Sequence, residues 1–228
     1  MHHAVHWAWI ILLVCFFNLF INYSVRLGYG VVLPEMIKDL GLSRTGGGSI
    51  YNAYLVTYIT LTPFTGYLTD RFGARRVISI CALILGLGVL LMGTVQSLGA
   101  ACLAYAVVGI GATGMWTPVL TVVQRWFALK RRGLALGILS TGYGLGFATM
   151  GVVFPFIVAS LNWRFAWYFL GIGALIMVVL NAVFLRSDPE SSGKIPWGST
   201  EKGTHPSVRP AVADNARISL WRQSPPGR

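Results

Sequence analysis

The chain has 228 residues, of which 55% are hydrophobic and only 11% are charged, with a mean hydropathy of +0.65 and a formal net charge of +11. Soluble proteins carry about 25% charged residues, so this composition excludes a soluble domain and predicts lipid as the main solvent of the chain. The basic residues stand in short clusters between long apolar runs, which does not favour nucleic acid as a partner.

Six apolar windows are long enough to cross a bilayer as helices, since a span needs about 20 residues at 1.5 Å each. In chain order they cover residues 7–32, 50–68, 77–95, 101–123, 134–161 and 165–185. Strands of a membrane barrel would be alternating segments of about 10 residues, a different pattern. The sequence therefore predicts an all-α, polytopic membrane domain over residues 1–186, with six transmembrane helices and the lipid bilayer as its surroundings.

The first window carries Arg26, the only charged residue inside the six predicted spans. Asn18, Asn22 and Arg26 follow each other at intervals of four and share one helical face. A charge within a membrane helix is costly and marks a site by default, and a guanidinium can bind a carboxylate with two parallel hydrogen bonds. This face is a candidate anion site. The alternative is that Arg26, near the outer end of the span, extends its charge to the headgroups.

The second and fourth windows carry polar and aromatic side chains that would suit the lining of a cavity. Tyr51, Tyr54 and Tyr58 repeat at helical spacing in the second window, and Trp116 lies in the fourth. Of these, Tyr54, Tyr58 and Trp116 are candidate substrate contacts, whereas Tyr51 could equally belong to an interfacial aromatic belt. In the fourth window, the spacing from Gly114 to Pro118 predicts an interruption of the helix. In the fifth, Gly142 with Gly146 and Gly133 with Gly137 predict close helix contacts.

The loop after the second window reads G-Y-L-T-D-R-F-G-A-R-R over residues 66–76. It resembles the signature loop between helices two and three of the major facilitator superfamily, G-x-L-x-D-R-x-G-x-R-R. A generic basic turn would explain the arginines but not the spacing of the glycines and the aspartate. The resemblance implies a gating motif made of Gly66, Asp70, Arg71, Gly73, Arg75 and Arg76.

The resemblance extends over about residues 7–198. The segments 125–127, 131–137, 162–164 and 186–190 are similar to the oxalate/formate antiporter and monocarboxylate porter branches. One departure is Tyr105, which stands where the R-x-x-x-G pattern of helix four has its arginine. This loss disfavours drug/proton antiport. The resemblance implies a secondary carrier, a symporter or antiporter, that moves a small organic anion such as a mono- or dicarboxylate by alternating access, with a proton as a candidate coupling ion.

Length departs from the family as well. Its carriers resemble two six-helix halves with the substrate between them, and this chain matches the first half and, over residues 216–222, the lead-in to a seventh helix. Two interpretations stay open. The chain is a truncated carrier, or it is a non-transporting remnant or a half that works as a homodimer or with a separate second half.

Orientation and tail complete the organisation. The segments after the second, fourth and sixth windows hold nine basic residues, against Lys38, Arg44 and Arg164 on the other side, so both termini are expected in the cytoplasm and the bundle in the plasma membrane. Residues 187–228 hold six of the ten prolines and are expected to form a linker or tail. No H-E-x-x-H or G-x-S-x-G motif occurs, and the three cysteines stand singly in apolar runs, so neither an enzyme nor a cofactor or metal site is expected.

Overall fold

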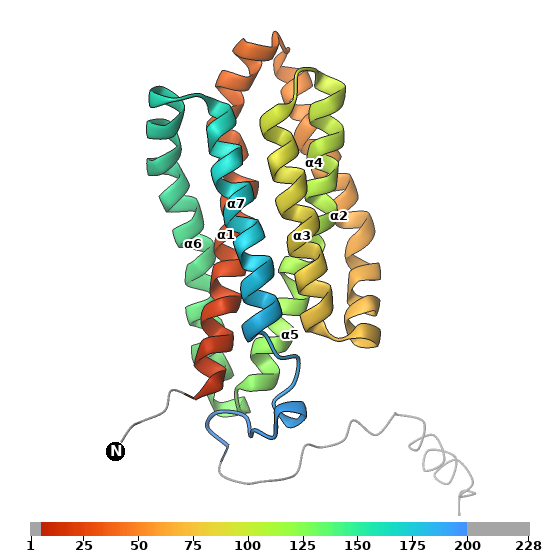
Figure 1. Cartoon of the computed structure of the whole chain (residues 1–228), viewed down its shortest axis with the longest axis vertical. Coiled ribbons are helices and arrows are strands. Elements are labelled where there is room, and N and C mark those ends of the chain that lie inside the picture. Colours follow the sequence, from red (N-terminus) through yellow and green to blue (C-terminus); the bar gives the residue numbers. More distant parts are fainter. Residues whose placement is uncertain (1–5, 200–228) are drawn as a thin grey trace, which may run out of the picture. The chain divides into compact units, whose positions relative to one another are not determined.

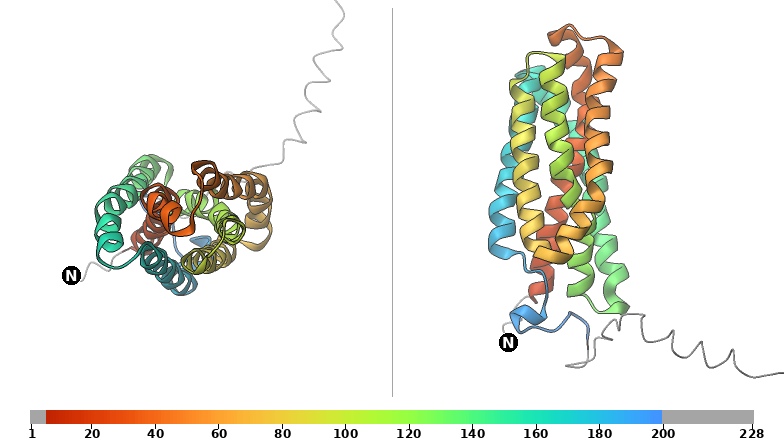
Figure 2. Two further views of the ribbon diagram at one scale, coloured as in Figure 1. Left: turned by 90° about the horizontal axis from the view of Figure 1, so that it is seen from above. Right: turned by 90° about the vertical axis from the view of Figure 1, so that its right-hand side faces the viewer.

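The computed structural model describes residues 6–199, in which seven α-helices and two short 3₁₀ turns form and no β-strand occurs. The helices are α1 (Trp7–Leu40), α2 (Arg44–Phe72), α3 (Ala74–Thr94), α4 (Leu98–Ala112), α5 (Thr117–Trp126), α6 (Leu129–Ser160) and α7 (Trp163–Phe184). They run up and down in one bundle (Figure 1), and the view along the bundle shows α1 among its neighbours (Figure 2). The 3₁₀ turns are η1 (Thr113–Met115) and η2 (Glu190–Ser192).

Five segments of the bundle are long and apolar enough to cross a membrane, namely α1, α3, the stretch Leu98–Trp126 that contains α4 and α5, α6, and α7. The second predicted span, α2, is 29 residues long but less apolar than these five, because tyrosines and threonines occupy many of its positions, and it packs mainly against α4. The prediction of an all-α, polytopic membrane fold is confirmed.

Helix α1 is longer than the apolar window predicts, since it continues past residue 32 to Leu40 with Pro34 inside it. It ends at Gly41, whose φ of 61° lies in the left-handed region that stops a helix. Arg26 therefore lies roughly 28 Å from the start of α1 and roughly 21 Å from its end, at 1.5 Å per residue. Arg26 thus lies near the middle of α1, because the helix continues for eight residues beyond the apolar window that ends at residue 32.

The fourth span is broken, as the Gly114 to Pro118 spacing predicts. Helix α4 ends at Ala112, the turn η1 follows, and α5 begins at Thr117 with Pro118 in its first turn. The hydroxyl of Thr113 in the break bonds to Ile110 O at 2.7 Å and accepts a hydrogen bond from Thr65 of α2, also at 2.7 Å. The backbone interruption is thus braced by a neighbouring helix, as interrupted membrane helices require.

Small residues set how closely the helices approach. A Cβ atom at Gly111 of α4 would lie 2.6 Å from Cys81 O, and one at Gly146 of α6 would lie 2.7 Å from Phe20 O of α1. Lipid supplies little hydrophobic drive for helix association, so such close backbone packing is a main source of stability. The predicted contact of Gly142 and Gly146 is confirmed, whereas that of Gly133 and Gly137 is wrong, because both have open space around them within the described residues.

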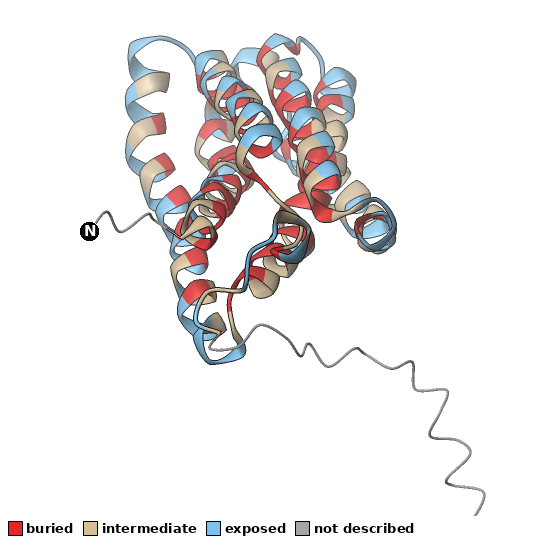
Figure 3. Cartoon of the chain, turned by 60° about the horizontal axis from the view of Figure 1, so that its bottom comes forward, coloured by how far each residue is buried: buried red, intermediate tan, exposed pale blue. Residues whose placement is uncertain are grey.

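At one end of the bundle, here called the terminal end, α1 begins and α7 ends. Figure 3 brings this end forward and shows the segment after α7 passing across it. The ring of Trp197 packs 5.1 Å from Trp9 and 5.7 Å from Phe127, and its backbone bonds to Trp126 and Ala128. We call Trp9, Phe127 and Trp197 the aromatic clasp. The remainder of the expected tail, from residue 200 and including 216–222, lies outside the described residues.

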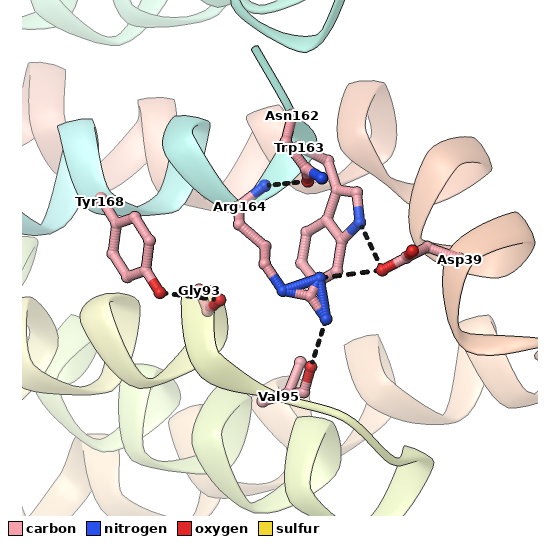
Figure 4. A network of polar contacts seen from close by, with 7 residues as sticks. All are labelled: Asp39, Gly93, Val95, Asn162, Trp163, Arg164 and Tyr168. Carbon is pink, nitrogen blue, oxygen red and sulfur yellow. Dashed lines mark hydrogen bonds and ion pairs between the residues drawn. The ribbon is translucent and has the colours of Figure 1, made fainter.

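At the opposite end, one arginine joins three parts of the bundle (Figure 4). The Arg164 guanidinium of α7 donates to Asp39 of α1 at 2.8 Å and to Val95 O, just after α3, at 3.0 Å. The indole of Trp163 donates to the same carboxylate at 3.1 Å, and the guanidinium lies 4.4 Å from the centre of that indole. These contacts fix the ends of α1, α3 and α7 relative to one another.

Candidate functional site

Arg26 projects from the middle of α1 toward a row of tyrosines. Its guanidinium carbon lies 5.7 Å from the ring centre of Tyr58 and 6.0 Å from those of Tyr54 and Tyr23, and its Nε donates to Tyr51 Oη at 3.4 Å. No acidic side chain among residues 6–199 forms an ion pair with it. The aromatic faces attract the charge by about 0.5–2 kcal/mol each, but they do not neutralise it.

Helix α2 supplies this row because positions three and four apart share one helical face. The rings of Tyr54 and Tyr58 stack at 5.9 Å with an angle of 5° between their planes, and Tyr51 stacks on Tyr54 at 5.8 Å and 24°. Behind them lies the buried side chain of Tyr105 of α4. Its ring centre is 5.1 Å from that of Tyr54, and its hydroxyl donates a hydrogen bond to Val25 O at 3.3 Å. The residue that replaces the expected arginine of helix four thus completes the wall behind Arg26.

A cavity of about 330 Å³ opens beside the guanidinium. Its wall comes from α1, α2, the residue before α5, and α6, and consists of Tyr23, Arg26, Leu27, Tyr51, Trp116 and Tyr143. Tyr23 packs edge-on against Tyr143 at 4.4 Å and against Trp116 at 5.9 Å. We call this cavity the Arg26 pocket. Its chemistry combines one fixed positive charge with aromatic surface.

The predicted contacts divide into two groups. Arg26 and Trp116 line the pocket, and Tyr54 and Tyr58 lie against the guanidinium. The two asparagines of the predicted face, Asn18 and Asn22, do not line it but border a separate void of about 10 Å³ beside α3 and α7.

Asn18 belongs to a structural contact between helices. It exchanges two hydrogen bonds with Asn181 of α7, at 2.7 and 2.9 Å, and also donates to Val14 O at 2.9 Å. Asn22 is buried nearby, and its carbonyl oxygen has no hydrogen-bond partner within the described part of the chain. The void beside it is large enough for about one water molecule.

The predictions from the sequence missed three wall residues, Tyr23, Leu27 and Tyr143. Tyr23 stands one helical turn before Arg26, and that spacing could have placed it on the same face. Tyr51 had two open interpretations, and its hydrogen bond to Arg26 places it in the wall. Tyr143 has no neighbouring motif, and only the packing of α6 beside α1 brings it to the pocket.

The signature loop lies at the terminal end and is bonded on one side. The φ of 84° at Gly73 makes the turn, and Arg75 donates to Ser187 Oγ through its backbone and to Ala182 O through its guanidinium. Asp70 is exposed, and across residues 6–199 it forms no ion pair. A Cβ atom at Gly66 would meet nothing within 4 Å in the same region.

The remaining loop residues keep to the surface. Arg71 donates to Tyr67 Oη at 3.2 Å and lies over the ring of Phe72 at 5.5 Å. No group of three or more His, Cys, Asp or Glu side chains that could hold a metal ion occurs in the described residues.

Comparison with known proteins gives relatives among membrane transporters. A probable sulfoacetate transporter of Cupriavidus necator is 28% identical over 176 residues, which are 77% of this chain and 41% of that protein. Human monocarboxylate transporter 14 is 30% identical over 199 residues, which are 86% of this chain and 38% of the relative. The chain thus spans about two fifths of the length of these relatives.

Solved structures show the same fold. A bacterial homologue of the human lysosomal transporter Spinster, in an inward-facing, unoccupied conformation, superposes with a TM-score of 0.72 at 18% identity. The match covers 96% of this chain and 51% of that one. The family model of the Major Facilitator Superfamily matches residues 12–224, well over half of the chain. This integral, multi-pass membrane chain therefore belongs to the Major Facilitator Superfamily.

Proposed function

We propose that this chain is the first half of a secondary transporter that moves a small organic anion by alternating access, with Arg26 as the anion anchor. The observation that carries the proposal is a guanidinium in mid-helix that borders the 330 Å³ pocket and has no carboxylate partner within residues 6–199. A charge in a membrane bundle is costly without a counter-charge, which a bound anion supplies. The substrates named for both curated relatives, sulfoacetate and monocarboxylates, are organic anions.

The substrate contacts follow from the pocket. Arg26 offers a fork of donors to the anion. Tyr54 and Tyr58 hold the guanidinium from behind, and Trp116 closes the wall beside the helix break. The amides of Asn18 and Asn22 support the site from one and two turns earlier in α1, where Asn18 ties this helix to α7.

The signature loop is the proposed gate. In this proposal the bundle lies in the plasma membrane and its terminal end faces the cytoplasm. Nine basic residues on the loops of this end, against three at the opposite end, support that orientation. Arg75 fastens the loop to α7 and to Ser187 just after it, and Asp70, Arg71 and Arg76 would latch the loop in one of the two transport states.

The experiment is binding and uptake of labelled carboxylates by the full chain in liposomes, with and without a pH gradient that reads proton coupling. Arg26→Gln removes the charge and is expected to abolish saturable binding, whereas Arg26→Lys keeps the charge without the fork and should retain part of it. Arg44→Gln, at the opposite end, is the matched control. Equal binding by wild type and Arg26→Gln would refute the assignment.

A second candidate is a half that acts as a homodimer or together with a separate second half. The chain spans 38–51% of the relatives described above, and Gly66 and Asp70 have no partner within the described residues. Crosslinking of a Gly66→Cys variant in membranes distinguishes the candidates. A homodimer gives a linked pair, a separate half gives a larger adduct, and a non-transporting remnant neither crosslinks nor binds an anion.

A further inference from the structure

The walls of the Arg26 pocket are unusually uniform. Four of its six lining residues are aromatic, Leu27 is aliphatic, and Arg26 is the one charged member. Aromatic side chains therefore make up most of the wall beside one cationic donor group, and the three tyrosines among them each add a hydroxyl.

The wall formed by Tyr23, Trp116 and Tyr143 is shaped for another ring. Tyr23 meets both neighbours almost at right angles, 88° with Tyr143 and 81° with Trp116, so the three side chains alternate edge and face. Aromatic pairs favour this arrangement, with ring centres 4.5–7 Å apart. Tyr143 keeps 46% of its surface exposed, so part of this ring surface stays free for a further contact.

The pocket carries one positive charge, which matches a ligand with one negative charge. Arg26 is the only charged residue of the six predicted spans, and the nearest charges along α1, at Glu35, Lys38 and Asp39, lie at the opposite end of the bundle. The hydrogen bond that Arg26 makes within the described residues leaves from Nε, so Nη1 and Nη2 remain to donate to a ligand. A dianion would place its second charge against aromatic walls that offer no cation.

We propose that the pocket selects an aromatic monocarboxylate, with the carboxylate on the Arg26 fork and the ring against Tyr23, Trp116 and Tyr143. This rests on the proposed anion site and narrows its ligand from organic anions in general to one class. An added ring contact of the aromatic kind is expected to favour benzoate over acetate roughly tenfold.

The experiment measures binding of labelled benzoate and labelled acetate to the purified full chain, each with unlabelled competitors. Benzoate should displace either label about tenfold better than acetate, and the dianion phthalate should compete more weakly than benzoate. Tyr143→Ala should reduce the affinity for benzoate and leave that for acetate unchanged. Phe147→Ala, one turn further along α6 and outside the pocket, is the matched control.

The outcomes separate the two proposals. If both anions bind in a manner that depends on Arg26 but with equal affinity, the anion site stands and the aromatic specificity is refuted. The same holds if Tyr143→Ala weakens acetate and benzoate alike. If neither anion binds saturably, or if binding survives Arg26→Gln, the proposed function itself is refuted and the specificity falls with it.

Discussion

The contact between Asn18 and Asn181 makes a sharp test of how α1 and α7 are held together. The two buried amides exchange two hydrogen bonds across the helix interface. Replacement of Asn181 by Leu removes both bonds and leaves the carbonyl oxygen of Asn18 without a donor, while its amide nitrogen keeps the bond to Val14 O. The single substitution therefore strands a buried acceptor between two membrane helices.

The size of the effect follows from the two lost bonds. Hydrogen bonds between membrane helices contribute about 0.6 kcal/mol on average and up to about 1.7 kcal/mol, so Asn181→Leu should lower the free energy of unfolding by about 1–3 kcal/mol. The double substitution with Asn18→Leu removes both polar groups and replaces them with side chains of similar volume. It should recover most of this loss, because no acceptor is then left unpaired.

The measurement is equilibrium unfolding of the purified chain in mixed micelles of increasing denaturing detergent, as a double-mutant cycle of wild type, the two single variants and the double variant. The reasoning predicts a coupling energy of about 1–3 kcal/mol between the two sites. If the two single losses simply add in the double variant, the amides do not act as a pair and the reasoning is refuted.

Three further predictions concern packing and the helix ends. Gly111→Ala should destabilise the bundle by about 1–3 kcal/mol, since its Cβ atom would overlap the backbone of α3, while Gly137→Ala in open space should be neutral or slightly stabilising in the same unfolding assay. Arg164→Met should lower stability by about 1 kcal/mol or less, because its ion pair is partly exposed, and a larger loss would show that the network of Figure 4 acts as a unit. The neutral ring of His6 caps α1, and burial and a nearby lysine lower the pKa of this ring. Its contribution to stability is therefore complete above the ordinary pKa of 6.5 and is lost as the pH falls through the pKa of the folded state. His6→Ala should remove this pH dependence from a series of melting curves.

The fold could be predicted from the sequence because lipid limits the choice. A chain with long apolar windows must satisfy its backbone as helices, and the loop at residues 66–76 then identifies the family. The helix ends could not be predicted this way. Hydropathy detects only the lipid-facing stretch, whereas α1 continues to Leu40 and α2 begins at Arg44, where the Ser43 hydroxyl accepts the backbone N–H of Gly46 at 3.0 Å.

The candidate site was only partly predictable, for a geometric reason. Arg26 and the tyrosines of α2 could be predicted, because the energetic cost of a charge in a membrane helix and the helical spacing of side chains are both properties of a single helix. The partner of Asn18 stands 163 positions away in the sequence, and Tyr143 reaches the pocket from α6. The equal spacing of Asn18, Asn22 and Arg26 along α1 suggested one site for all three. In the bundle, Asn18 and Asn22 lie beside α3 and α7, whereas Arg26 lies in the pocket.

The aromatic clasp has a consequence for synthesis of the chain. Trp9 stands in the first turns of α1 and Trp197 near the last described residue, yet their rings are 5.1 Å apart. The ribosome makes Trp9 long before its partner, so α1 enters the membrane with this contact unfilled and gains it only when the segment after α7 arrives. The junction of α5 and α6 gains its bond at the same stage, because Ala128 donates a hydrogen bond to the backbone of Trp197. The contacts that close the terminal end can thus form only after all seven helices have been synthesised.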